Sequence, residues 1–267
     1  MKKLSSKIYV GLVMLFLYAP ILVLILYSFN DGKTTVWKGF TFKWYKELFR
    51  DSSLMESVYN TLLIAFLAAI FATILGTLAA LGIYNFKGFS KKLLLNVSNI
   101  PIINPEIVTG VSFMLLFVFL GELLNFEMGF TTVLLAHIGF CVPYVILNVM
   151  PKLRQMDISL FEAAQDLGCN PRKAFVKVVI PEIMPGVISG FLMAFTYSLD
   201  DYIITYFTRG SKFQTLPIEI ATMLKKRISP TINALSALLF IITLSVLIII
   251  NIRGSKKEKE AVSGKKI

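Results

Sequence analysis

Charged side chains are scarce in this chain. Only 16% of its 267 residues are Asp, Glu, Lys or Arg, against roughly 25% in ordinary globular domains. Hydrophobic residues make up 56% of the chain, and the mean hydropathy is +0.73. The charged and polar residues that remain supply too little polar surface to cover a soluble globule. The composition therefore excludes an ordinary soluble domain and favours an all-α protein whose helices cross a lipid bilayer several times.

Cysteine and histidine are nearly absent, which excludes several other classes. Cys141 and Cys169 offer no disulfide framework. His137 lies four residues before Cys141, but two ligands do not make a metal site. The sequence has no phosphate-binding glycine loop and no nucleophile–base arrangement. We therefore expect a protein that is not an enzyme and has no catalytic residue, no metal and no cofactor. Any energy source has to come from a partner chain.

The net charge of +11 would, in a soluble protein, raise the idea of nucleic-acid binding. Here most of the basic residues lie in loops and tails beside apolar runs. Loops on the cytoplasmic side of a membrane carry an excess of Lys and Arg. The charge therefore predicts a membrane topology rather than a nucleic-acid partner.

Apolar runs predict six transmembrane helices in one domain over residues 8–252, where about 20 residues suffice to span the bilayer. The first run is too long for the apolar part of a cleavable signal. Residues 1–7 and the basic tail 253–267 are both predicted to lie in the cytoplasm of a bacterial cell, so that the protein is a multi-pass protein of the plasma (inner) membrane. The predicted spans cover about 8–28, 58–84, 93–120, 130–150, 186–207 and 231–252.

The third predicted span is interrupted by two prolines, Pro101 and Pro105. Proline removes a backbone donor and disfavours helix in the residue before it. Asn104 is typical of an N-cap, with Pro105 at the first helical position and Glu106 in the first turn. We therefore expect a new helix to begin partway into the membrane.

An aromatic segment over residues 30–57 follows the first span. Thr41 is predicted to cap a short helix. Its Trp44, Tyr45, Leu48 and Phe49 side chains would face the outer membrane interface.

A polar segment over residues 157–181, which we call the coupling segment, lies between the fourth and fifth spans. Ser159 and Glu162 have the spacing of a capping box. A short helix is expected to end at Leu167, with Gly168 left-handed after it. Asn170 and Pro171 would begin a second short helix, ended by Pro181 and Pro185. About 35 residues separate the two spans, where 2–8 are common in helix bundles, so a docking surface explains this length better than a plain hairpin loop.

The coupling segment also carries a motif. Glu162-Ala163-Ala164, three residues, Gly168, nine residues and Val178-x-Ile180-Pro181 resemble the EAA motif of ATP-binding-cassette importer permeases with the type I (MetI-like) fold. Val178 and Ile180 stand where that family has Ile and Leu. The resemblance implies that the segment enters a cleft on an ATPase subunit. The residues that it assigns to this coupling are Glu162, Ala163, Ala164, Asp166, Gly168 and Pro181.

The same resemblance implies a set of partners. They are a homologous second permease subunit that completes a heterodimer, two copies of a cytoplasmic ATP-binding subunit, and an extracytoplasmic substrate-binding protein. Within the family, three stretches resemble the permease subunits of spermidine/putrescine importers, which implies a polyamine-binding protein. These stretches are Trp37–Thr41 with Trp44-Tyr45, Pro105–Val108, and Ser198–Asp201. Glu106 stands where Asp is expected.

Three acids, Glu106, Asp200 and Asp201, lie within predicted spans that contain no Lys or Arg. A carboxylate at the bilayer centre costs about 2.5–3.5 kcal/mol or more, so it is functional or paired by default. Tyr202 and its neighbours would add cation–π contacts. We expect these four residues to line a pathway for a polycation. The alternatives are a helix-dipole role for Glu106 and partial exposure of the Asp pair near the outer interface.

Two other functions stay open on the sequence. A permease of the same architecture could carry another solute such as a metal cation. A proton-coupled secondary transporter could use the acids as a relay, but it would work without ATP and need no docking segment.

Overall fold

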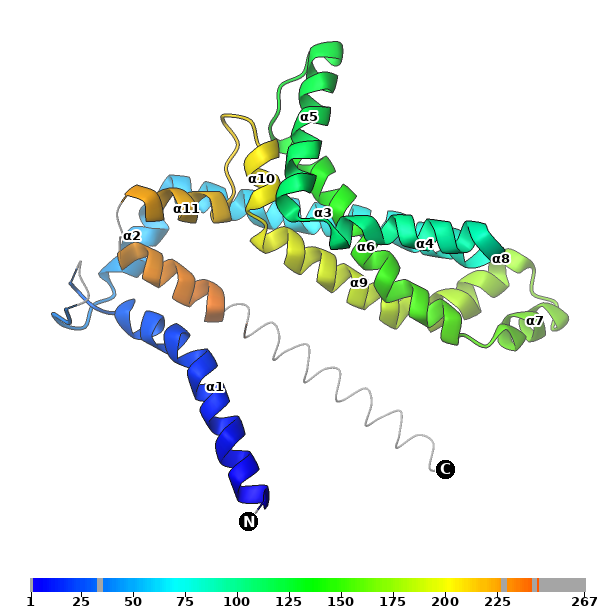
Figure 1. Ribbon diagram of the computed structural model, residues 1–267, viewed down its shortest axis with the longest axis horizontal. Coiled ribbons are helices and arrows are strands. Elements are labelled where there is room, and N and C mark those ends of the chain that lie inside the picture. The colour runs from blue at the N-terminus through cyan, green and yellow to red at the C-terminus, as the bar shows by residue number, and fades with distance from the viewer. Residues whose placement is uncertain (1, 33–35, 227–229, 242–243, 245–267) are drawn as a thin grey trace. The chain divides into compact units, whose positions relative to one another are not determined.

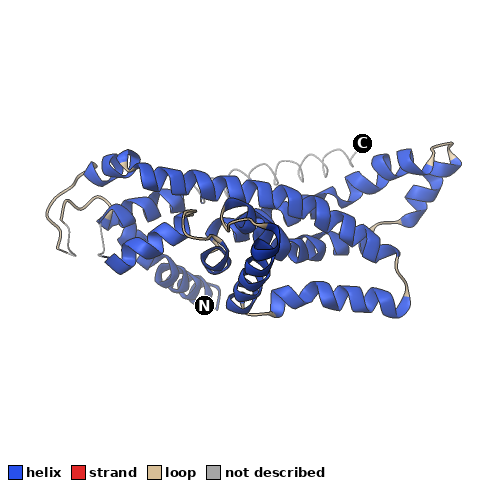
Figure 2. Ribbon diagram, turned by 90° about the horizontal axis from the view of Figure 1, so that it is seen from above, coloured by secondary structure: helices blue, strands red, loops and turns tan. Residues whose placement is uncertain are grey.

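The computed structural model describes residues 2–32, 36–226, 230–241 and 244, and helices account for most of them (Figures 1 and 2). The β-structure found in these residues is one isolated bridge between Asn30 and Phe40. The chain divides into two compact units. One unit comprises residues 1–55 and 220–267, and the other comprises residues 56–219.

The first unit contains α1 (Lys2–Tyr27) and α2 (Lys43–Arg50), together with a helix over Pro230–Ile241. The large apolar side chains of α1 are exposed, Phe16 to 81%, as expected of a helix that lipid surrounds. The sixth predicted span, 231–252, is described only over 231–241 and at residue 244. Its remainder and the tail 253–267 lie outside the described residues.

The predicted interfacial helix, α2, does not present its whole aromatic face to the outside. Trp44 and Leu48 are buried, and the Trp44 indole N–H donates to the Asn30 carbonyl at 2.7 Å. The Asn30 side chain in turn accepts hydrogen bonds from the backbone of Gly32 and Lys38. The prediction that Trp44 and Leu48 face the interface was therefore wrong, because both side chains are buried in the protein.

The second unit contains most of α3 and the helices up to the start of α11. Their order in the chain is α3 (Ser52–Asn85), α4 (Gly88–Ile103), α5 (Glu106–Leu124), α6 (Phe130–Gln155), α7 (Ile158–Asp166), α8 (Pro171–Ala174), a π-helical turn (Phe175–Val179), α9 (Ile180–Asp200), α10 (Ile203–Thr208) and α11 (Leu216–Lys226).

The core of the second unit lies along α6, which packs against α9 (Figure 1). Val145 is fully buried there. A Cβ on Gly190 of α9 would lie 3.2 Å from the Val145 Cα, and a Cβ on Gly76 of α3 would lie 2.6 Å from its Cβ. The small residues of α3 thus allow close helix contact.

Five helices among the described residues are long and apolar enough to cross a membrane. They are Lys7–Tyr27, Ser52–Asn85, Glu106–Leu124, Phe130–Gln155 and the continuous stretch Pro171–Asp200. The third predicted span is two helices, α4 and α5, of which only α5 is long enough by itself. The number and sidedness of the spans in a membrane stay predictions.

The prolines of the coupling segment do not end the second helix as predicted. The helix runs on from Pro171 to Asp200 through the π-helical turn. Pro181 falls in the first turn of α9, where an absent N–H is tolerated. Pro185 lies inside α9, as prolines of membrane helices often do.

Candidate functional site

The break between α4 and α5 brings Glu106 to the start of a helix. Asn104 has the extended backbone (φ −71°, ψ 136°) that a residue before proline prefers. Pro105 is the N-cap and Glu106 the first helical residue, one position later than predicted. Local sequence sets this break, because Pro105 disfavours helix at the residue before it.

A second break, which the sequence did not predict, separates α9 from α10. α9 ends at Asp200, and Asp201 has extended backbone (φ −63°, ψ 125°) before α10 begins at Ile203. Asp201 caps α10, because its carboxylate accepts the backbone N–H of Ile204 at 3.2 Å and that of Thr205 at 2.8 Å. The predicted fifth span, 186–207, is therefore not one continuous helix.

A buried hydrogen-bond network joins this break to α6. The His137 Nδ1 lies 2.6 Å from the Ser198 hydroxyl, and its Nε2 lies 2.9 Å from the Thr205 hydroxyl. Nε2 also lies 3.3 Å from the Asp201 Oδ2. The side chains of His137 and Asp201 are only 1% and 5% exposed.

His137 is the functional candidate that sequence reasoning missed. Its sequence position suggests only a metal ligand beside Cys141, and no metal-binding cluster of His, Cys, Asp or Glu occurs in the described residues. The available signal was a single His within an apolar run that also holds no Lys or Arg. A buried imidazole of this kind requires polar partners, and a carboxylate on another span is the natural choice.

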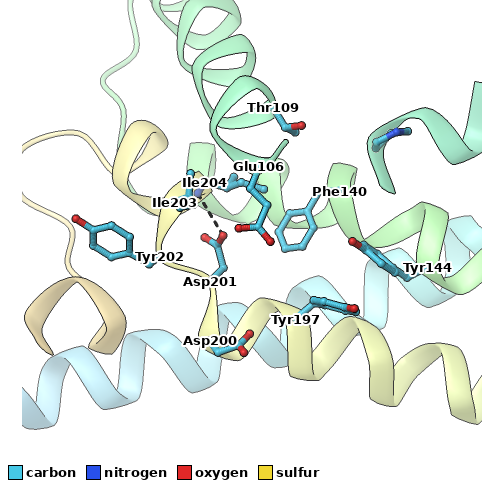
Figure 3. Close-up of a pocket in the computed structure, with 11 residues that line it drawn as sticks. Glu106, Thr109, Phe140, Tyr144, Tyr197, Asp200, Asp201, Tyr202, Ile203 and Ile204 are labelled. Carbon is cyan, nitrogen blue, oxygen red and sulfur yellow. Dashed lines mark hydrogen bonds between the residues drawn. The ribbon is translucent and has the colours of Figure 1, made fainter. Parts of the chain in front are cut away.

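The two breaks meet at a cavity of about 340 Å³. Glu106, Asp200 and Asp201 all line it, and so do Tyr202 and Tyr197. In Figure 3 the carboxylates of Glu106 and Asp201 both point into the space between α5 and the α9–α10 break. All four predicted pathway residues are thus brought to one cavity, and none of the described residues that line it is basic.

Aromatic rings form part of the cavity wall. Tyr144 of α6 and Tyr197 of α9 are stacked with ring centroids 4.3 Å apart. Tyr202 lines the cavity as well, but in Figure 3 its ring points away from the carboxylates of Glu106 and Asp201. The stacked Tyr144–Tyr197 pair and Asp200 thus line the same cavity.

The coupling segment contains the two expected short helices, but the first is capped differently. Asp157, not Ser159, is the N-cap of α7, and its carboxylate accepts the Ser159 backbone N–H at 3.0 Å. Hydrogen bonds from the Ser159 side chain and backbone hold the pKa of Asp157 below its usual value. The predicted Ser159–Glu162 capping box was therefore wrong, because Asp157, two residues earlier, takes the N-cap position.

The turn after α7 follows the prediction. Gly168 has a left-handed φ of +88°. Its N–H donates to the Gln165 carbonyl, and the Cys169 N–H donates to that of Ala164, which is the Schellman arrangement. Asn170 then caps α8 by accepting the Lys173 N–H. Glu162, Ala163 and Asp166 are exposed on α7, Ala164 is half-buried, and Leu167 is 88% exposed.

These features agree with comparisons with known proteins. Residues 72–253 match the family model described as "Binding-protein-dependent transport system inner membrane component". The chain belongs to this family, and it is a permease subunit rather than an enzyme. It is thus a multi-pass membrane protein of a binding-protein-dependent transport system.

Among curated relatives, the chain is similar to the putrescine transport system permease protein PotI of Escherichia coli strain K12. The two are 42% identical over 84% of this chain and 81% of the relative. It is also similar to the spermidine/putrescine transport system permease protein PotC of the same strain, with 34% identity over 91% of each chain.

A solved structure of a bacterial ABC transporter involved in the import of the acidic polysaccharide alginate shares the fold. Its TM-score is 0.70 at 15% identity, over 95% of each chain. The all-α, type I importer permease fold is therefore confirmed. Since the cargo named for that transporter is an acid, the fold alone does not identify the cargo of this chain.

Proposed function

We propose that this chain is the permease subunit of an ATP-binding-cassette importer for polyamines of the spermidine/putrescine class. The observation that carries the proposal is the cavity where Glu106 and Asp200 meet, without a basic residue among the described residues that line it. The similarity to PotI and PotC supports the same substrate class.

The chemistry of the cavity suits an alkyl chain with ammonium groups. Separate carboxylates attract separate cationic ends, and the Tyr144–Tyr197 pair adds apolar surface and a cation–π face. Glu106 and Asp200 are exposed to solvent in the described structure. Such contacts steer transit rather than hold the substrate tightly, because a permeation site must release its cargo.

Energy would enter through the coupling segment. α7 presents Glu162, Ala163 and Asp166 on its surface, and the small alanine side chains leave room for close packing of an ATPase. Gly168 shapes the turn between the two short helices, and Pro181 lies in the first turn of α9 beside the π-helical turn. A movement of the docked ATPase that displaces α7 would thus also displace α9, which ends at Asp200.

The assembly that we propose contains one copy of this chain and a homologous second permease subunit, with two copies of a cytoplasmic ATP-binding subunit. A polyamine-binding protein would deliver substrate from the extracytoplasmic side. Both termini and the coupling segment would lie in the cytoplasm, in keeping with the basic loops.

Uptake measurements test the substrate and the energy source together. Membrane vesicles that contain the complete transporter are supplied with labelled spermidine and the binding protein. Uptake of labelled spermidine should require ATP on the side of the membrane where the ATPase subunits lie. Unlabelled putrescine should compete with the labelled spermidine. Competition by divalent metals instead would indicate a metal permease. Uptake driven by an imposed proton gradient without ATP would indicate a secondary transporter.

A pair of glycine variants tests the coupling assignment. Gly168→Asp and Gly88→Asp both place a side chain at a positive φ, +88° and +61°, with open space around it. Only Gly168 lies in the coupling segment. Gly168→Asp should abolish co-purification of the ATPase and uptake, whereas Gly88→Asp should retain both. Equal losses in the two variants would contradict docking at this turn.

A further inference from the structure

We propose that His137, Ser198 and Thr205 form a clamp that holds Asp201 as a positioning residue, which leaves Glu106 and Asp200 as the carboxylates that meet the substrate. The inference rests on the proposed function. It divides three acids that line one cavity into one structural acid and two that act on the cargo.

The Asp201 carboxylate accepts three hydrogen bonds from α10. Its Oδ1 accepts the Ile204 N–H, and its Oδ2 accepts both the N–H and the hydroxyl of Thr205 at 2.8 Å. The His137 Nε2 approaches the same oxygen at 3.3 Å, and the side chain is 5% exposed. A carboxylate with these donors has little capacity left for an ammonium group.

The direction of these bonds makes His137 a donor toward the break. Because Thr205 gives its hydroxyl proton to Asp201, its oxygen can only accept from His137. The Nε2 atom therefore carries a proton in every arrangement that satisfies the network. On the other side of the ring, Nδ1 pairs with the Ser198 hydroxyl at 2.6 Å. Both ring nitrogens are thus used.

The clamp joins three elements across the break. His137 belongs to α6, Ser198 to the last turn of α9, and Thr205 to α10. Hydrogen bonds from one buried ring thus fix both ends of the interruption. Asp201, in extended backbone after the last residue of α9, is held beside His137 with its side chain only 5% exposed. Asp200, the last residue of α9, is exposed.

The position of Glu106 depends on the same clamp through α10. That helix packs against α5, and the contact is close at Gly110, one turn after Glu106. A Cβ at Gly110 would lie 2.9 Å from the Phe207 ring and 3.4 Å from the Ile203 carbonyl oxygen. A change in the direction of α10 would therefore shift the start of α5 and its carboxylate.

The test is the ratio of putrescine to spermidine uptake by the full transporter in cells. Misplaced carboxylates change the ratio, because the diamine and the longer triamine need different spacings. A loss of folded protein lowers both rates in proportion. His137→Leu, Ser198→Ala and Thr205→Val should each change the ratio by about threefold or more. Thr205→Ser, which keeps the hydroxyl, should restore it.

Two controls make the result decisive. Thr196→Val removes an exposed hydroxyl from the same helix as Ser198, one that bonds only its own Leu192 carbonyl in the described network, and it should leave the ratio unchanged. The double variant His137→Leu/Thr205→Val should change the ratio no more than either single variant. The proposal would be overturned if the clamp variants kept the wild-type uptake ratio. It would also be overturned if the change in the ratio in the double variant equalled the product of the changes in the two single variants.

Failure of the proposed function gives a different result. If the wild-type transporter takes up neither polyamine, the substrate assignment fails, and the clamp is then tested by thermal unfolding of the purified complex. His137→Leu and Thr205→Val should lower Tm by similar amounts and by no more in combination. Additive decreases would overturn the clamp.

Discussion

The two helix breaks of this protein place acids beside the same cavity by opposite means. The break before Glu106 is built from its own residues, because Pro105 fixes the backbone of Asn104. The break at Asp201 contains no proline and depends on His137, which lies more than sixty residues earlier in the chain. We call the break before Glu106 the local break and the break at Asp201 the tertiary break. The local break should persist when distant contacts are removed, whereas the tertiary break should not.

The largest expected effect is at the tertiary break. Asp201→Ala removes two cap bonds of α10 and leaves the Thr205 hydroxyl without its acceptor in a buried site. The free energy of unfolding should fall by about 2–4 kcal/mol. Equilibrium unfolding of the purified chain in mixed detergent micelles measures this change.

Asp157→Ala is the matched control, because it removes the cap of α7 at an exposed site. Its cost should stay near about 1 kcal/mol. Equal costs in the two variants would mean that burial and the His137 network add nothing at Asp201.

An intermediate effect is expected where the two breaks meet. Gly110→Ala places a methyl group 2.9 Å from the Phe207 ring and should lower the free energy of unfolding by about 1–3 kcal/mol through overpacking. Gly82→Ala, inside α3 with open space around it, should instead raise the stability by about 0.5–1 kcal/mol through helix propensity. A stabilising Gly110→Ala would show that α10 does not seat closely on α5.

The smallest effect is expected at the local break. Pro105→Ala changes a residue at an N-cap with a backbone (φ −56°, ψ 134°) that alanine also adopts, and no intrahelical N–H bond is lost there. The main cost is the added freedom of the unfolded chain, about 0.5–1 kcal/mol. A loss above about 2 kcal/mol in the same unfolding experiment would reverse the comparison, because proline would then be holding tertiary structure.

The coupling segment shows a similar division between local and distant causes. The Gly168 turn and the Asn170 cap could be predicted, because the conformations of a left-handed glycine and of an N-cap are determined by a few neighbouring residues. The end of the second helix was predicted wrongly at Pro181. Continuation through Phe175–Val179 as a π-helical turn depends on the packing of Val179 and Ile183, which are buried in the core.

The sequence by itself determined the membrane setting, the all-α class, the break before Glu106 and the motif of the coupling segment. Each follows from composition or from residues a few positions apart. Only the tertiary structure decided that Asp200 and Asp201 differ. The two are chemically identical neighbours, and what separates them is burial against α6. His137 reaches across to one carboxylate and leaves the other exposed to the cavity.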